Sequence, residues 1–228
     1  MVGAVFFDLW NTLVYCPTRD RIEEVISLLG LKIGYEDFMF GLRPMIFTDS
    51  NLGFDDYLKG YLKGQDITFD KALLSEAERL WRSRLEDTKL FPETEEVLQD
   101  LKKDHKIGLI SNLDESGAEY FKRRFGGIYA LFDVVLFSCE VSLVKPDERI
   151  FRKALAQVGA RPEESWMVGD RIQDDITGAI NAGMNPILID REGKVNNPGF
   201  PVIRNLREIR QVIENENLHG RSFRANTS

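Results

Sequence analysis

The chain has 228 residues, a net charge of −7 and a charged fraction of 29%, which fits one large domain or a core domain that carries a smaller insert. An acidic protein is poorly suited to wrapping nucleic acid or docking on anionic lipid, and no apolar stretch approaches the roughly 20 residues of a membrane helix, so we expect neither partner and a cytoplasmic location. The two cysteines, Cys16 and Cys139, stand apart from each other and from any Cys/His cluster, which argues against a zinc site or a disulfide framework.

The first predicted element is a strand over residues 4–7. Ala4-Val5-Phe6-Phe7 is a short apolar, β-favouring run of the kind that forms strands buried on both faces. No such run occurs between about residues 17 and 87, where apolar residues recur at helical spacing instead. The four helical patterns span residues 22–29, 38–42, 57–62 and 73–81. We therefore predict a small helical domain over residues 16–87, inserted into a core domain made of residues 1–15 and 88–228.

Strands and helices alternate beyond this insert. Further strands are predicted at 107–110, 134–137, 166–168 and 186–189, with 201–203 as a candidate last strand. Helices are predicted at 94–103, 148–158, 174–182 and 206–216. Regular alternation of this kind is typical of an open parallel sheet with helices on both faces. The predicted fold class is therefore α/β.

Polar residues follow the predicted strands at their carboxyl ends, which is where open parallel sheets bind ligands. Asp8 follows the first strand, Ser111 and Asn112 follow the second, and Asp170 follows the fourth. Lys145 lies in the loop after the third strand. Each residue taken singly has a structural explanation, such as a helix cap or a solvated surface charge. Their joint occurrence, in order, predicts one crevice that collects them all.

These residue types suit phosphoryl transfer. Asp8 and Asp170 on neighbouring strands would repel each other without a cation between them, and paired carboxylates suit Mg²⁺, which prefers oxygen ligands. The metal lets a carboxylate nucleophile approach a phosphoryl group, so Asp8 is predicted to form a covalent aspartyl intermediate that water then hydrolyses. Lys145 and the Ser111 hydroxyl are predicted to bind the phosphoryl oxygens.

Four segments resemble, in order, the four motifs of the haloacid dehalogenase-like hydrolases. They are FFDLWNTL at 6–13, ISN at 110–112, VKPD at 144–147 and VGDRIQDD at 168–175. The resemblance implies a Rossmann-like core and, in one large branch, a helical cap between the first two motifs. It also implies Asp8 as the nucleophile and Ser111 and Lys145 as binders of the phosphate or of the intermediate.

The same resemblance implies a set of metal ligands and a small phosphorylated metabolite as substrate. The ligands would be Asp8, the main-chain carbonyl of Trp10, Asp170 and a second acid of the fourth motif. Asp175 fits that acid better than Asp174, because it directly precedes the Ile-x-Gly-Ala run. We expect a monomer or small homo-oligomer. The residues expected to contact the substrate are Trp10, Asn11, Thr12, Asn112 and, in the cap, Arg43.

Two positions of the first motif depart from the family pattern. Phosphatases of the family usually carry a second aspartate two places after the nucleophile, where it protonates the leaving group; here that place holds Trp10, and Asn11 replaces the usual glycine. Tryptophan cannot be a general acid, and loss of one typically costs about 10²–10⁴ in rate. We therefore predict a preference for acyl and aryl phosphates, whose leaving groups need little protonation.

An aromatic residue at this place also resembles the 2-haloacid dehalogenases, which attack carbon and use no metal. In that alternative, Arg43 would bind the halide and carboxylate. Because Asp170 and Asp175 are retained, and would lie uncompensated beside Asp8 without a cation, we favour a Mg²⁺-dependent phosphatase. The dehalogenase and a phosphoryl-binding module without turnover stay as alternatives.

Overall fold

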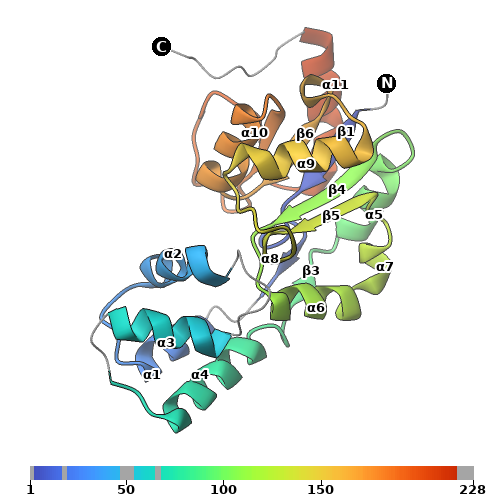
Figure 1. The fold of residues 1–228 in the computed structure, drawn as a ribbon. Coiled ribbons are helices and arrows are strands. Elements are labelled where there is room, and N and C mark those ends of the chain that lie inside the picture. The colour runs from blue at the N-terminus through green and yellow to red at the C-terminus, as the bar shows by residue number, and fades with distance from the viewer. Residues whose placement is uncertain (1–2, 17–19, 47–53, 65–67, 220–228) are drawn as a thin grey trace.

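A parallel sheet forms the centre of the protein. The computed structural model describes residues 3–16, 20–46, 54–64 and 68–219. Its six-stranded sheet has the order β5-β4-β1-β6-β7-β8, and every neighbouring pair is parallel (Figure 1). The strands are β1 (Ala4–Phe7), β4 (Lys106–Ser111), β5 (Val134–Phe137), β6 (Trp166–Gly169), β7 (Asn185–Ile189) and β8 (Val202–Ile203). The predicted α/β class is confirmed.

Helices cover both faces of this sheet, because alternate strand residues point to opposite sides. In β1, Val5 and Phe7 join one hydrophobic core, whereas Ala4 and Phe6 join the other. The first core is completed by α5 (Thr94–Leu101), α6 (Glu115–Arg124), α7 (Gly126–Tyr129) and α11 (Ile209–His219). The second is completed by α9 (Glu148–Val158) and α10 (Thr177–Asn181). A short helix, α8 (Ser138–Val141), follows β5, and single 3₁₀ turns lie at Pro162–Glu164 and Leu206–Glu208.

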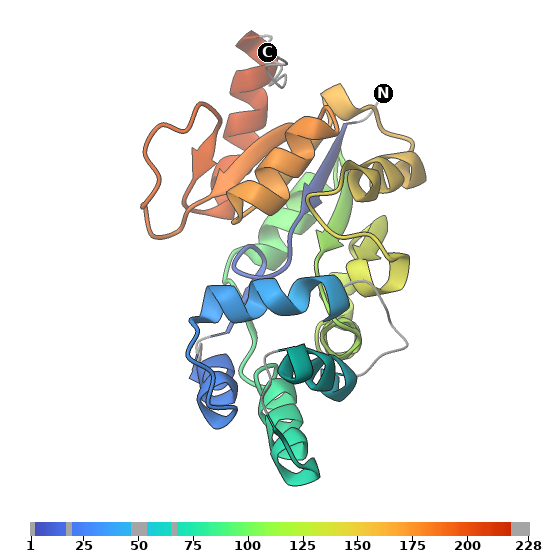
Figure 2. The same ribbon diagram turned by 60° about the vertical axis from the view of Figure 1, so that its left-hand side comes forward.

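The chain between β1 and β4 forms the predicted helical insert. Its helices are α1 (Asp20–Leu28), α2 (Tyr35–Ile46), α3 (Phe54–Gly64) and α4 (Lys71–Ser83), and they pack around a hydrophobic core of their own. Phe54 and Trp81 stack in that core with ring centroids 4.4 Å apart. Phe40 belongs to the apolar pattern predicted over residues 38–42, but its side chain lies outside this core and is 72% exposed. Figures 1 and 2 show the bundle lying off the carboxyl ends of the sheet strands. The division at residues 16 and 87 stays a prediction.

A two-stranded antiparallel ribbon, which the sequence analysis missed, joins the insert to the core. Val14–Tyr15 (β2) pairs with Lys89–Leu90 (β3), and two residues are too few for periodicity to reveal a strand. The ring of Tyr15 lies 4.7 Å from that of Phe91. The two segments that connect the insert to the core are therefore hydrogen-bonded to each other.

The helix predicted over 174–182 begins earlier than expected and with a different geometry. A π-helical turn over Ile172–Ile176 precedes α10, and π turns of this kind occur frequently at functional sites. None of the described helices is both long and apolar enough to cross a membrane.

Candidate active site

Three carboxylates meet at the carboxyl ends of β1 and β6. The backbone N–H of Asp8 donates to the carbonyl of Val168 at 2.9 Å, so Asp8 directly continues the strand pairing. Asp8, Asp170 and Asp175 each offer an oxygen, and these oxygens lie within 4.8 Å of one another. The structure thus brings together the three side chains predicted to bind metal. Asp174 instead forms an ion pair with Arg171 at 3.0 Å.

The π turn and a glycine bring Asp175 into this cluster. The backbone N–H of Asp175 donates to the carbonyl of Arg171 at 2.9 Å, and the N–H of Arg171 donates to Oδ2 of Asp175 at 3.0 Å. A Cβ atom on Gly169 would lie 2.3 Å from the carboxyl carbon of Asp175. Only glycine leaves room for this approach, which explains the Gly-Asp pair at the end of β6.

Lys145 lies between two of the carboxylates. Its Nζ donates to Oδ1 of Asp8 and to Oδ1 of Asp175, both at 2.6 Å, and its side chain is only 2% exposed. The side-chain amide of Asn112 holds the main chain of Lys145: its Nδ2 donates to the carbonyl at 3.0 Å, and its Oδ1 accepts from the N–H at 2.8 Å. Asn112 was expected to contact the substrate, and its side-chain amide positions Lys145.

The charges in this cluster do not balance. Burial, together with the charges of Asp8 and Asp175, raises the pKa of Asp170 to about 7. Burial also raises the pKa of Asp175 to about 6, in spite of the neighbouring Lys145. Burial opposes the charged form of Lys145, but the carboxylates of Asp175 and Asp8 outweigh it and raise the pKa of this ammonium group. One cation facing three carboxylates leaves excess negative charge, and the hard oxygen donors suit a divalent metal.

A cavity of about 320 Å³ lies against this cluster, and we call it the small cavity. Asp8, Ser111 and Lys145 line it from the core. Oγ of Ser111 is fully buried and has no hydrogen-bond partner among the described residues, so it is available to an oxygen of a ligand. The insert contributes side chains from α2, namely Tyr35, Asp37, Met39 and Phe40.

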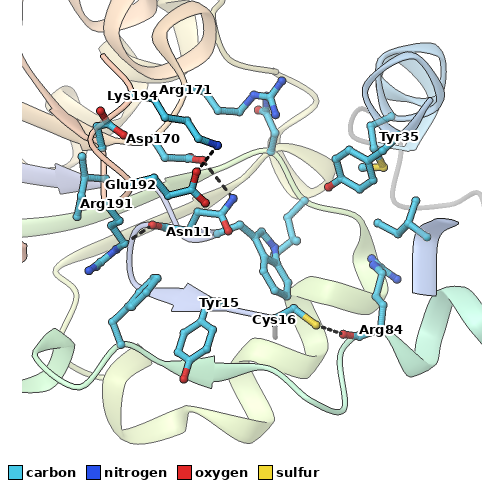
Figure 3. Close-up of a pocket in the computed structure, with 18 of the residues that line it drawn as sticks. Asn11, Tyr15, Cys16, Tyr35, Arg84, Asp170, Arg171, Arg191, Glu192 and Lys194 are labelled. Carbon is cyan, nitrogen blue, oxygen red and sulfur yellow. Dashed lines mark hydrogen bonds and ion pairs between the residues drawn. The ribbon is translucent and has the colours of Figure 1, made fainter. Parts of the chain in front are cut away.

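A second cavity of about 690 Å³, the large cavity, extends from the first one between the core and the insert. Trp10, Asn11, Asn112 and Asp170 line both cavities. Figure 3 shows Tyr35 and Arg84 entering the large cavity on one side, and Asn11, Asp170, Arg191 and Lys194 on the other. The two cavities together run from the carboxylates to a wider end, which is lined by Ile22 and by the charged side chains of Arg84 and Arg191.

Three predicted substrate contacts need separate mention. Asn11 has a φ of 56°, in the left-handed region that asparagine tolerates, and this explains how it can stand where glycine is usual. Thr12 is fully buried and lines neither cavity, contrary to the expectation that it contacts the substrate. Arg43 falls in α2, and its side chain lies outside the described part of the structure.

Several cavity residues were not predicted from the sequence. Arg191 directly follows Asp190 at the carboxyl end of β7, so the strand-end rule that selected Asp8 would also have selected it. Tyr35 and Arg84 come from the insert, and no local pattern distinguishes them from other helix residues.

Known proteins resemble this chain over most of its length. The family model for haloacid dehalogenase-like hydrolases matches residues 2–183. The glyceraldehyde 3-phosphate phosphatase of Methanothermobacter thermautotrophicus is 45% identical over 200 residues, which cover 84% of this chain and 87% of the relative. The human N-acylneuraminate-9-phosphatase is 28% identical over 218 residues, or 88% of each chain.

Solved structures share the fold. A 2-haloacid dehalogenase from Pseudomonas syringae superposes with a TM-score of 0.67 at 24% identity, covering 94% of this chain and 99% of that one. A phosphatase from Thermococcus onnurineus superposes with a TM-score of 0.61 at 23% identity, covering 92% and 97%. Both chemistries therefore occur on this fold, and the residues of the site must distinguish them.

Proposed function

Because this chain belongs to the haloacid dehalogenase-like hydrolases, we propose that it is a Mg²⁺-dependent phosphatase that hydrolyses a small phosphorylated metabolite through an aspartyl-phosphate on Asp8. The observation that carries the proposal is the convergence of Asp8, Asp170 and Asp175 within 4.8 Å, beside the buried Lys145. The oxygen ligands fit Mg²⁺. The three carboxylates and the carbonyl of Trp10 would hold the ion, which supplies positive charge next to the phosphoryl group when bound.

The proposed reaction has two displacements at phosphorus. A carboxylate oxygen of Asp8 forms a bond to phosphorus while the bond to the leaving oxygen breaks, and that oxygen takes a proton from solvent because Trp10 has none to give. Water then attacks phosphorus and releases a proton to solvent, the bond to Asp8 breaks, and inorganic phosphate leaves with the carboxylate restored. The ammonium of Lys145 and the hydroxyl of Ser111 bind the phosphoryl oxygens in both steps. In the described cluster, Lys145 already contacts the nucleophile at 2.6 Å.

The dehalogenase alternative fits the charges less well. A 2-haloacid carries a carboxylate of its own, and the cluster of three carboxylates around one ammonium would repel it. A phosphatase uses the same excess charge to hold its metal. Trp10 remains the one residue of the first motif that favours the dehalogenase.

The comparisons also suggest a substrate class. The relatives named above act on glyceraldehyde 3-phosphate and on N-acylneuraminate 9-phosphate, which are phosphate esters of small polar carbon skeletons. A ligand of this kind would place its phosphate in the small cavity and its carbon skeleton in the large one. Glyceraldehyde 3-phosphate is the first compound of this class to test, and because it is an alkyl phosphate and Trp10 supplies no proton, we expect it to turn over more slowly than p-nitrophenyl and acetyl phosphate.

The test is phosphate release from p-nitrophenyl phosphate, acetyl phosphate and glyceraldehyde 3-phosphate, with Mg²⁺ and with EDTA. Chloride release from L-2-chloropropionate is measured in parallel. Asp8→Asn should abolish turnover, whereas Asp133→Asn, at a residue that lines neither cavity, serves as the matched control. Mg²⁺-dependent phosphate release that is lost only in Asp8→Asn supports the proposal. Chloride release in EDTA would replace it with the dehalogenase, and phosphoryl-mimic binding without any turnover would replace it with a binding module.

A further inference from the structure

Arg191 makes a set of contacts that the proposed chemistry does not use. Its Nη2 donates to the carbonyl of Thr12 at 2.8 Å and its Nε to the carbonyl of Asn11 at 3.3 Å. Its Nη1 donates to Oε1 of Glu93 at 2.8 Å, and Glu93 is only 3% exposed. The guanidinium carbon lies 3.3 Å from the ring centroid of Phe91. Arg191 is thus fixed from three directions, and two of its bonds go to the main chain just after Trp10.

The turn whose carbonyls accept hydrogen bonds from Arg191 also contacts the carboxylate cluster, through the side chain of Asn11. Nδ2 of Asn11 donates to Oδ2 of Asp170 at 3.1 Å, and Figure 3 shows this bond next to the bond between Arg191 and the Asn11 carbonyl. Asn11 has a left-handed backbone, with φ at 56°, a sparsely populated conformation that persists where surrounding contacts hold it. The bonds from Arg191 are such contacts.

We propose that Arg191 is a positioning residue for the metal site: by holding the carbonyls of Asn11 and Thr12, it keeps the Asn11 amide on Asp170 and so sets the affinity for the divalent ion. The inference rests on the proposed function, which supplies the metal. Partners that orient metal ligands in this way typically change affinity by about 10–100-fold when they are removed.

Arg191 also lines the large cavity, so the test must separate metal positioning from binding of an anionic substrate. Loss of a substrate contact would raise KM and leave metal affinity unchanged. Loss of the positioning contact would weaken metal binding in the absence of substrate. The readout is therefore binding of Mn²⁺ to the full chain, with free Mn²⁺ measured by electron paramagnetic resonance.

The variants are Arg191→Met, which removes every side-chain hydrogen bond of Arg191, and Arg191→Lys, which keeps the positive charge but loses the planar guanidinium with its several donors. The matched control is Arg210→Met, since Arg210 bonds Asp100 and Asp104 at 2.8 Å and lines neither cavity. We expect the Kd for Mn²⁺ to rise about 10–100-fold in Arg191→Met, to rise less in Arg191→Lys and to stay unchanged in Arg210→Met. Adding Arg191→Met to Asn11→Ala should weaken binding no further, because the effect passes through Asn11.

An unchanged Kd in a cooperatively folded Arg191→Met would overturn the proposal, and so would a raised KM with unchanged Mn²⁺ affinity. Should Arg191→Met fail to fold, Arg191→Lys and Glu93→Gln decide the question by the same titration. Failure of the proposed function looks different: the unmodified chain would then bind no Mn²⁺, or Asp170→Asn would bind it equally well.

Discussion

Replacing Lys145 by methionine removes the ammonium group that two buried carboxylates share. Methionine keeps an unbranched apolar stem, so the change is mainly one of charge. Lys145 is 2% exposed and Asp175 is 1% exposed, so solvent screens their interaction little. Removing one partner of a buried ion pair costs about 3–5 kcal/mol, and two hydrogen bonds to charged groups at about 1.5–3 kcal/mol each give a similar sum. We therefore expect the metal-free variant to lose about 3–5 kcal/mol of unfolding free energy near pH 8.

The loss should depend on pH and on Mg²⁺. Without Lys145, protonation of the carboxyl groups relieves their repulsion, so the difference from the unmodified chain should be smaller at pH 5. Mg²⁺ should stabilise Lys145→Met more than the unmodified chain, because the ion then compensates a larger negative charge. Urea unfolding in EDTA and in Mg²⁺ at both pH values measures each of these differences.

The control is Lys122→Met, which removes a surface ion pair with Glu140 whose partners are 36% and 40% exposed and which should cost at most about 1 kcal/mol. The reasoning is refuted if Lys145→Met loses no more stability in EDTA than Lys122→Met. It is also refuted if Mg²⁺ stabilises Lys145→Met no more than the unmodified chain.

Three further predictions concern the leaving group, acid stability and thiol reactivity. Since Trp10 cannot donate a proton, p-nitrophenyl and acetyl phosphate should be hydrolysed faster than alkyl phosphates in steady-state assays. Trp10→Asp should raise the rate of alkyl phosphate hydrolysis by up to about 10²-fold. Equal rates on both kinds of substrate in the unmodified chain would contradict this prediction. Burial opposes ionisation of Asp114, but the charge of Arg84, at 2.8 Å, and hydrogen bonds from Ser116 and Trp81 together outweigh it and lower the pKa of this carboxyl. Its stabilising effect is therefore present above its unfolded pKa of about 4 and is lost as the pH falls below that value, so thermal unfolding of Asp114→Asn should depend less on pH between about 3 and 5. Burial, with Glu140 as a lesser cause, raises the pKa of the Cys139 thiol to about 12, so iodoacetamide at pH 8 should label Cys139 only after unfolding, as mass spectrometry would show.

Much of the fold and the centre of the site follow from local sequence. Parallel strands are buried on both faces, so they appear as apolar runs such as Ala4-Val5-Phe6-Phe7, and the helices between them have their own period. Strands that run in parallel share one carboxyl edge, so residues just past that edge must lie close together. The shared edge therefore predicts that Asp8, Lys145 and Asp170 lie close together, as they do in the structure.

Tertiary structure alone decided what each side chain does at that edge. Thr12 and Asn112 are both polar residues of segments that follow a predicted strand, yet Thr12 is fully buried and Asn112 holds the main chain of Lys145. Tyr35 and Arg84 reach the cavity because the insert packs against the core. The physical reason is that sequence periodicity shows only which face of a helix or strand is apolar. The direction of a polar side chain depends on contacts between residues far apart in the chain. The same is true of the way in which the insert and the core, each with its own hydrophobic core, pack against each other.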